Sequence, residues 1–382
     1  MKWEKVKLGD VCEITSSKRI FYSEYVDDGV PFYRSKEIIE SDEGKIIENP
    51  LYISVDKYNE IKEKFGVPQT GDMLLTSVGT IGIPYIIKKK DCFYFKDGNL
   101  TWFRDFREGL NSKYLYYWIK SSEGTGTLYN TTIGSSQKAL TISALKNIKV
   151  SLPPRSVQDK IVEVVSVYDD LIENNQKQIK LLKEAAQRLY KEWFVDLHFP
   201  GHENTKIVDG VPEGWRRGLL KELISVNYGK DHKKVPDDGN IPVYGSGGLM
   251  RKCNKSLFSG EAVLIPRKGS LNNIMYVDET FWTVDTMFYA TMKQPHTAVF
   301  VYFFVKAFDM YSMNIGAAVP SMTTKILDAM DVVIPDKETL EKFDKYAKVY
   351  FNKIKTLQGQ NEQLKTARDL LLPKLMSGEV EV

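Results

Sequence analysis

The sequence predicts an α/β protein in which two mixed, β-rich globular domains are joined by two long antiparallel helices. Three observations support this prediction: the chain length, an internal repeat, and a heptad pattern that closes each copy of the repeat. The 382 residues are too many for one ordinary core, because domains usually hold about 100 to 200 residues. The 42% hydrophobic and 27% charged residues are typical of a globular chain that buries substantial cores.

The internal repeat sets the organisation of the chain. Ile133-Gly134 returns as Ile315-Gly316, and Leu152-Pro153 returns as Ile334-Pro335, both 182 positions later. The same offset relates three helical residues in each half: Leu182, Ala185 and Leu189 with Leu364, Ala367 and Leu371. Earlier segments match at other offsets, as loop insertions would produce: Trp3 with Trp215, and Gly71-Asp72-Met73-Leu74-Leu75 with Gly260-Glu261-Ala262-Val263-Leu264. The repeat therefore predicts a pseudo-two-fold molecule whose chain ends lie close together.

The predicted domains are residues 1–152, a central spacer helix over 153–196, a linker with the second domain over 197–334, and a distal spacer helix with a tail over 335–382. Short apolar runs mixed with glycine predict mainly strands in both globular parts, as in Met73-Leu74-Leu75 and Phe93-Tyr94-Phe95. Helical patterns also occur around Ser112 to Ile119 and around Ala298 to Phe308.

Each fixed-length segment is predicted to be a long helix that starts after Pro153-Pro154 or Pro335. Pro373 and then Ser377-Gly378 are expected to close the second helix. About 40 residues at 1.5 Å each make the first helix roughly 60 Å long, which suits a spacer better than one small domain. A long helix packed on its own domain is the alternative, but an apolar stripe this narrow favours a partner helix.

Apolar residues recur in alternating steps of four and three along both helices, which is the pattern of a coiled coil. The first seam comprises Ile161, Val165, Tyr168, Ile172, Asn175, Ile179, Leu182, Ala186, Leu189 and Trp193. The second comprises Phe343, Ala347, Tyr350, Ile354, Leu357, Asn361, Leu364, Arg368, Leu371 and Leu375. The second helix has only the first to pack along, so the pair should be antiparallel. One asparagine in each seam, Asn175 and Asn361, is expected to set register and orientation.

Composition and missing motifs narrow the function. Cys12, Cys92 and Cys253 lie far apart without a CxxC pair, and neither a signal-peptide pattern nor an apolar run of about 18 residues occurs, so we expect a cytoplasmic protein. The net charge of +3 permits nucleic-acid binding without requiring it. The chain lacks GxxxxGK[ST], and Pro200-Gly201 prevents His198 and His202 from sharing a helix face as zinc ligands. No cofactor, metal or catalytic residue is therefore predicted.

Two catalytic motifs are matched only in part. Asn49-Pro50-Leu51-Tyr52 is similar to the Asn-Pro-Pro-Tyr loop of adenine methyltransferases, but Leu51 replaces the second proline and no GxGxxG-like fingerprint accompanies it. Pro236-Asp237 and Pro335-Asp336 could open a nuclease motif, yet neither is followed in its own half by an acidic residue two positions before a lysine. Asp336 also stands at a helix start, where aspartate is favourable.

Several motifs together resemble the specificity subunits of type I restriction-modification enzymes over essentially the whole chain. The central ones are Leu152-Pro153-Pro154-Arg155 with Gln158, Leu189-Tyr190-Lys191-Glu192-Trp193-Phe194-Val195-Asp196, and Val211-Pro212-Glu213-Gly214-Trp215. The others are Tyr244-Gly245-Ser246-Gly247-Gly248, Arg267-Lys268-Gly269-Ser270, and the tail from Leu371 to Val380. The resemblance implies a subunit without catalysis of its own that binds double-stranded DNA, two methylation subunits and ATP-dependent restriction and translocation subunits. It would direct adenine methylation at a two-part DNA target.

Loops rich in Lys, Arg, Asn, Gln and small polar residues are the candidates for DNA contact, because these residues bond phosphates and base edges. In the first half they are Ser17, Lys18, Arg19, Arg34, Ser35, Lys36, Ser77, Gly79, Thr80, Gln137 and Lys138. In the second half they are Asn227, Tyr228, Lys230, Lys233, Lys234, Tyr244, Gly245, Ser246, Gly247, Gly248, Arg267, Lys268, Gly269, Ser270 and Asn272. For each residue, a solvated loop charge or a turn residue is the alternative. A self-contained nuclease or methyltransferase and a coiled-coil scaffold remain alternative functions.

Overall fold

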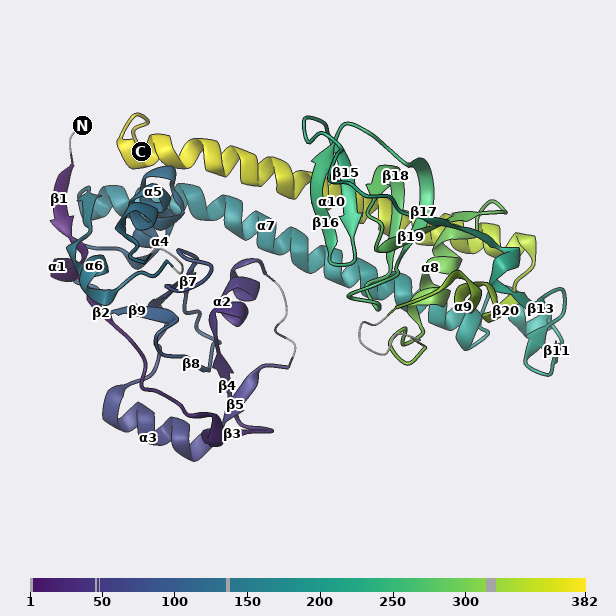
Figure 1. The fold of residues 1–382 in the computed structure, drawn as a ribbon, viewed down its shortest axis with the longest axis horizontal. Coiled ribbons are helices and arrows are strands. Elements are labelled where there is room, and N and C mark those ends of the chain that lie inside the picture. The colour runs from purple at the N-terminus through teal and green to yellow at the C-terminus, as the bar shows by residue number, and fades with distance from the viewer. Residues whose placement is uncertain (1–2, 45–46, 48, 135–137, 314–320) are drawn as a thin grey trace. The chain divides into compact units, whose positions relative to one another are not determined.

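The structure is a computed structural model that describes residues 3–44, 47, 49–134, 138–313 and 321–382. The chain forms two compact units, residues 1–177 with 357–382 (unit 1) and residues 178–356 (unit 2). Each unit combines sheets with helices, and α7 and α10 contribute to both units, so the predicted α/β architecture is confirmed (Figure 1). The predicted domain boundaries at 152, 196 and 334 stay a prediction. Within the residues described here, no helix has both the length and the apolar character needed to cross a membrane.

Unit 1 contains two four-stranded sheets, with strand orders β2-β9-β6-β7 and β3-β5-β4-β8, and a two-stranded ladder of β1 with β10. Its strands are β1 (Glu4–Lys7), β2 (Glu13–Thr15), β3 (Tyr25–Val26), β4 (Val30–Tyr33), β5 (Leu51–Ile53), β6 (Met73–Thr76), β7 (Pro84–Ile86), β8 (Tyr94–Phe95), β9 (Leu100–Arg104) and β10 (Lys149–Leu152). Its helices are α1 (Leu8–Val11), η1 (Tyr22–Glu24), α2 (Ser35–Asp42), α3 (Val55–Phe65), α4 (Ser112–Lys120), α5 (Ser122–Thr131) and α6 (Ile142–Asn147).

Unit 2 is built on one six-stranded sheet of order β14-β19-β17-β18-β15-β16, in which only the β15–β18 pair is parallel. Its strands are β11 (Ile207–Val208), β12 (Val211–Pro212), β13 (Arg216–Leu219), β14 (Ile224–Tyr228), β15 (Ile241–Gly245), β16 (Gly248–Cys253), β17 (Phe258–Pro266), β18 (Met275–Thr283), β19 (Met287–Met292) and β20 (Asp331–Ile334). Its shorter helices are η3 (His202–Asn204), η4 (Leu220–Glu222), α8 (Ala298–Lys306) and α9 (Thr324–Asp328).

The repeat extends into the structure of the two units. The ladder of β1 with β10 pairs Glu4 with Leu152, and the ladder of β13 with β20 pairs Arg216 with Ile334. Thr141 caps α6 and Thr323 caps α9, each through its hydroxyl oxygen, and the two threonines stand 182 positions apart. The predicted internal repeat is therefore present in strand pairing and helix capping, not only in sequence.

The two long helices are α7 (Arg155–Tyr190), which continues as the π-helical turn η2 (Lys191–Val195), and α10 (Lys337–Ser377). They are antiparallel in each unit (Figure 1). In unit 1, Arg368 meets Asp169 and Asn361 meets Asn175, while in unit 2 the ring of Phe343 lies against Trp193. Every predicted seam residue is buried or half-buried, since none is classed as exposed.

The core of each unit is completed by the end of a long helix. Leu372, Leu375 and Met376 of α10 are buried in the core of unit 1 with Leu8 and Trp118. The equivalent turns at the end of α7 place Tyr190 and Trp193 in the core of unit 2. A Cβ on Gly378 would lie 3.1 Å from Trp3 Cζ2, so the two ends of the chain meet in unit 1, as the repeat predicts.

Two details differ from the sequence analysis. Pro373 does not help to end the second helix, because α10 continues to Ser377 and stops at Gly378, whose φ is +72°. The buried neighbours of Pro373 hold this last turn on the core although one intrahelical bond is missing. The first half also contains more helix than the pattern indicated. Ser54 caps the unpredicted α3 by accepting from the amide of Lys57, and Gly66 (φ +78°) ends it.

Candidate nucleic-acid interface

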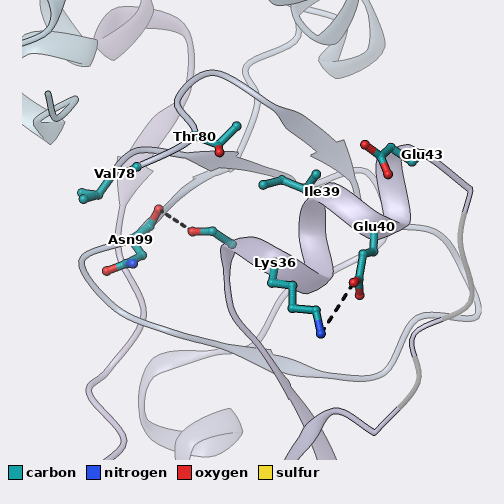
Figure 2. A pocket seen from close by; sticks show the side chains of 9 residues that line it. Lys36, Ile39, Glu40, Glu43, Val78, Thr80 and Asn99 are labelled. Atoms are coloured by element: carbon teal, nitrogen blue, oxygen red, sulfur yellow. Dashed lines mark hydrogen bonds and ion pairs between the residues drawn. The ribbon is translucent and has the colours of Figure 1, made fainter. Parts of the chain in front are cut away.

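Four of the predicted contact residues of unit 1 line one surface hollow of about 500 Å³. Ser35 and Lys36 come from the first turn of α2, and Gly79 and Thr80 come from the loop after β6. Figure 2 shows this loop facing α2, with Asn99 beside it. The Ser35 hydroxyl donates to the Asn99 carbonyl at 3.5 Å, and Lys36 lies 3.7 Å from Glu40. The hollow therefore presents both donors and acceptors.

Arg34 shapes the hollow by holding the start of α2. Its Nη2 donates to Glu37 Oε1 at 2.6 Å, and its backbone amide donates to Glu37 Oε2 at 2.8 Å. Burial raises the pKa of Glu37, but the hydrogen bonds from Arg34 outweigh it and leave that pKa below its usual range. The guanidinium of Arg34 is thus engaged within the protein.

The loop after β6 is fixed from inside. Ser77 is buried and its hydroxyl lies 2.7 Å from that of Thr101, so this side chain faces the core rather than the hollow. Its amide donates to the Asn99 carbonyl at 2.8 Å. Gly79, with φ +79°, turns the chain outward beyond it, a conformation that favours glycine.

Lys138 reaches the same region from another segment. The adjacent Ala139 bridges both Val78 and Ile133, and Lys138 Nζ lies 3.5 Å from the centroid of the exposed Tyr129 ring. Gln137 falls outside the described residues.

The predicted stretch from Ser17 to Arg19 does not line the hollow. Ser17 is buried, the amide of Lys18 donates to the Tyr94 hydroxyl at 2.7 Å, and Arg19 Nε donates to Asp97 Oδ2 at 2.8 Å. Arg19 and Lys18 remain exposed.

In unit 2 the structure brings together two motifs that are distant in sequence. Gly245, Ser246, Gly247 and Gly248 form the tip between β15 and β16, and the segment Arg267–Ser270 follows β17. A Cβ on Gly269 would lie 2.7 Å from Ser246 Oγ, and Asn273 Nδ2 donates to the Ser246 carbonyl at 2.8 Å. The glycine allows this close approach, and its φ of +83° also requires the left-handed region.

Arg267 and Tyr228 meet beside these turns. The guanidinium carbon of Arg267 lies 5.5 Å from the centroid of the Tyr228 ring, and Arg267 Nη1 donates to the Asp285 carbonyl at 3.2 Å. Lys268 is exposed next to them and forms a bridge with Ser321.

The other predicted residues of unit 2 divide into tied and exposed side chains. The Tyr244 hydroxyl donates to Glu279 at 2.6 Å. Burial, and to a lesser extent this hydrogen bond, raises the pKa of Tyr244. Asn227 Nδ2 donates to the Ser225 carbonyl, and Asn272 Nδ2 donates to Asp309 at 2.9 Å. These three side chains are therefore engaged by bonds within unit 2. The exposed ones are Lys230, Lys233, Lys234 and Ser270.

The loops after β6 and β17 are equivalent. Each contains a glycine in the left-handed region followed by a hydroxyl residue: Gly79 with Thr80, and Gly269 with Ser270. Val78 bridges Ala139 and Lys268 bridges Ser321, and the two partners stand at the 182-residue offset of the repeat. The same offset relates Tyr129 to Tyr311, whose hydroxyl donates to the Gly269 carbonyl at 3.1 Å, so the repeat could have assigned Tyr129 to its loop. Neither composition nor this offset singles out Asn99 or Asn273.

The chemistry available at both loops is hydrogen bonding and charge. Amides, hydroxyls and cations of this kind suit phosphates and base edges. Within the part of the chain that the structure describes, no three His, Cys, Asp or Glu residues are grouped to hold a metal ion.

Comparisons with known proteins assign the family. The profile of the type I restriction modification DNA specificity domain matches residues 1–184 and again 212–366. The MjaIX specificity subunit of a type I restriction enzyme from Methanocaldococcus jannaschii is 26% identical over 432 residues, covering 100% of this chain and 94% of that protein. The MjaVIII specificity subunit of the same organism is 21% identical and covers 100% of this chain and 93% of its own length.

A solved structure agrees in fold. The S subunit of a type I restriction-modification system from M. genitalium has a TM-score of 0.57 at 18% identity, covering 98% of this chain and 96% of that one. Because the domain profile matches once in each half and the two matches together cover most of the chain, the resemblance in the motifs is confirmed. The chain belongs to the family of type I restriction-modification specificity subunits.

Proposed function

We propose that each unit reads one half of an interrupted, asymmetric DNA target, while α7 and α10 fix the distance between the halves. The observation that carries the proposal is the pair of equivalent loops. Gly79 and Gly269 have the same backbone conformation, but they follow Ser77-Val78 in unit 1 and Arg267-Lys268 in unit 2. Two domains that share a loop conformation but differ in the side chains on the loop suit a DNA target with two unlike halves. Readers on one face of a duplex act about one turn apart, roughly 34 Å.

The hollow of unit 1 has the chemistry for base contact. Lys36 can bond guanine, Glu40 can accept from the cytosine amino group, and Ser35 and Thr80 can pair with either kind of edge. Lys138 and the backbone amide of Gly79 suit phosphate. In unit 2, Lys268, Ser270 and the amides of Gly247 and Gly248 supply equivalent phosphate contacts.

The partners follow from the family. We assign two methylation subunits to the helix pair and ATP-dependent restriction and translocation subunits to the full complex, in which this chain recognises DNA and catalyses nothing. A chain of this kind acts on DNA in the reducing cytoplasm, in keeping with three free cysteines.

The deciding experiment maps methylated adenines in the DNA of cells that carry the chain with its methylation subunit. We expect one motif made of two specified halves separated by a gap of fixed length. Adenine methylation or cleavage by the purified chain alone would establish the enzyme alternative instead. DNA binding that does not weaken as salt rises would favour the scaffold, because phosphate contacts release counterions.

A further inference from the structure

Arg267 of unit 2 is held in place by its backbone and by its side chain. Its amide donates to the Thr286 carbonyl at 2.8 Å, and its carbonyl accepts from the amide of Met322 at 2.9 Å. Its Nη1 donates to the Asp285 carbonyl, and its guanidinium lies over the Tyr228 ring. Because Asp285 holds one nitrogen and Tyr228 covers one face, the guanidinium loses little conformational entropy when it binds a ligand.

Tyr228 forms a firm support for this group. It is the last residue of β14 and pairs with Phe288 of β19 in the sheet register. The two rings are perpendicular, with centroids 5.0 Å apart, and Phe288 is fully buried in the core. The side chain of Tyr228 is nevertheless 53% exposed, so the core fixes the ring at a position that an outside partner can reach.

The donors of Arg267 are largely free, which sets it apart from Arg19 and Arg34, the arginines among the predicted contact residues of unit 1. Arg34 is bound to Glu37 and Arg19 to Asp97. Among the described residues, Arg267 forms no ion pair with a carboxylate, and its one side-chain bond leaves four of the five guanidinium N–H groups.

We propose that Arg267 reads a guanine in the half-site of unit 2 and that Tyr228 is its positioning residue. The inference rests on the proposed function and adds the base that unit 2 selects. An arginine with paired free donors bonds O6 and N7 of guanine together, which distinguishes guanine from the other bases in the major groove. The face of the Tyr228 ring keeps the Arg267 guanidinium in one orientation, and the N–H groups that do not bond Asp285 remain available for the base.

Unit 1 offers a matched control. Lys138 lies over the exposed Tyr129 near the equivalent glycine turn, so a cation and an aromatic ring meet beside both turns. The ammonium of lysine is a compact point charge without a planar fork. We therefore expect Lys138 to contact phosphate and to carry affinity without a base preference.

The test uses the full chain co-produced with its methylation subunit, with the genomic DNA of the host cell as the probe. In Arg267→Ala and Arg267→Lys, preference for one guanine in one half-site should fall roughly ten- to hundred-fold while the other half-site stays unchanged. Tyr228→Ala should relax the same position, and Tyr228→Phe should keep the wild-type motif because the ring remains. Lys138→Ala should lower methylation at all sites together without relaxing any base.

The outcomes separate the inference from the proposed function. A wild-type chain without a two-part motif would overturn the proposed function. A two-part motif that Arg267→Lys leaves unchanged, or that relaxes at a base other than guanine, overturns the inference alone. If Arg267→Lys abolishes methylation, the decision passes to duplexes that carry the wild-type target with one position randomised at a time. Retained guanine enrichment in the bound fraction overturns the inference, and lost enrichment supports it.

Discussion

Asn175 Nδ2 donates a hydrogen bond of 2.9 Å to Asn361 Oδ1 across the seam between α7 and α10, and both side chains are buried. Asn175→Ala should destabilise the protein by about 1 to 3 kcal/mol, because Asn361 then remains buried without a partner. Replacing both residues with Leu should restore stability but weaken the alignment of the helices. Urea unfolding measures the stability of both variants. The exposed Asn174→Ala is the control, and an equal loss in that variant would contradict the prediction.

Arg368 and Asp169 form a second polar contact on the same seam, at 2.6 Å, and the Tyr117 hydroxyl donates to the other oxygen of Asp169 at 2.7 Å. Arg368→Leu should cost about 1 to 3 kcal/mol, since Asp169 then loses its cationic partner. Arg188→Leu is the control, because that pair with Glu184 lies on the surface at 3.8 Å and should contribute under about 1 kcal/mol. Similar unfolding midpoints for the two variants would show that the seam pair is not special.

Asp336 couples the start of α10 to Trp215. Its oxygens accept from the amide of Thr339 at 2.9 Å and from Trp215 Nε1 at 3.0 Å. Burial raises the pKa of Asp336, but these bonds outweigh it and leave that pKa below its usual value. Asp336→Ala should therefore cost about 1 to 2 kcal/mol at pH 7.

The pH dependence of that loss has a definite sign. A carboxyl whose pKa is depressed by folding stabilises the protein above its unfolded pKa of about 4, and the stabilisation disappears as the pH falls through the folded value. The gap in urea midpoint between wild type and Asp336→Ala should thus narrow below about pH 4. A gap that stays constant down to pH 3 would exclude the carboxylate as its cause.

Gly79 and Gly269 provide a matched pair of substitutions. Both have φ near +80°, so Ala at either position should cost about 1 kcal/mol of backbone strain. A Cβ at Gly79 meets nothing within 4 Å, whereas one at Gly269 lies 2.7 Å from Ser246 Oγ. Gly269→Ala should therefore also displace the Ser246 turn and disturb recognition of one half-site. A methylation map of Gly269→Ala in which both half-sites change equally would contradict this prediction.

The spacing role of the helices has its own test. Inserting one heptad into α7 and one into α10 at matched positions keeps both seams in phase. The gap between the two DNA halves should lengthen while both halves stay recognisable. An unchanged gap in the methylation map would argue against the helices as the spacer.

The sequence predicted the elements that depend on pattern. Heptads located α7 and α10, and the 182-residue offset related Leu152 at the end of β10 to Ile334 at the end of β20, although it did not predict their pairing with β1 and β13. It did not predict which candidates would be free for DNA. Ser77 turns inward to Thr101, and Tyr244 is tied to Glu279, because partners far along the chain decide where a polar side chain points. The stacking of Arg267 on Tyr228 likewise depends on the pairing of β14 with β19, which no local motif encodes.

The way the two units share the chain has a consequence for synthesis on the ribosome. Unit 1 begins with the first residues but is completed by 357–382, whose Leu372, Leu375 and Met376 fill its core. At 5 to 20 residues per second, the intervening residues 178–356 take roughly 10 to 40 s to emerge. The unit that is made first is therefore finished last. During that delay its apolar interior lacks its final layer, and holding chaperones would find their binding surface there.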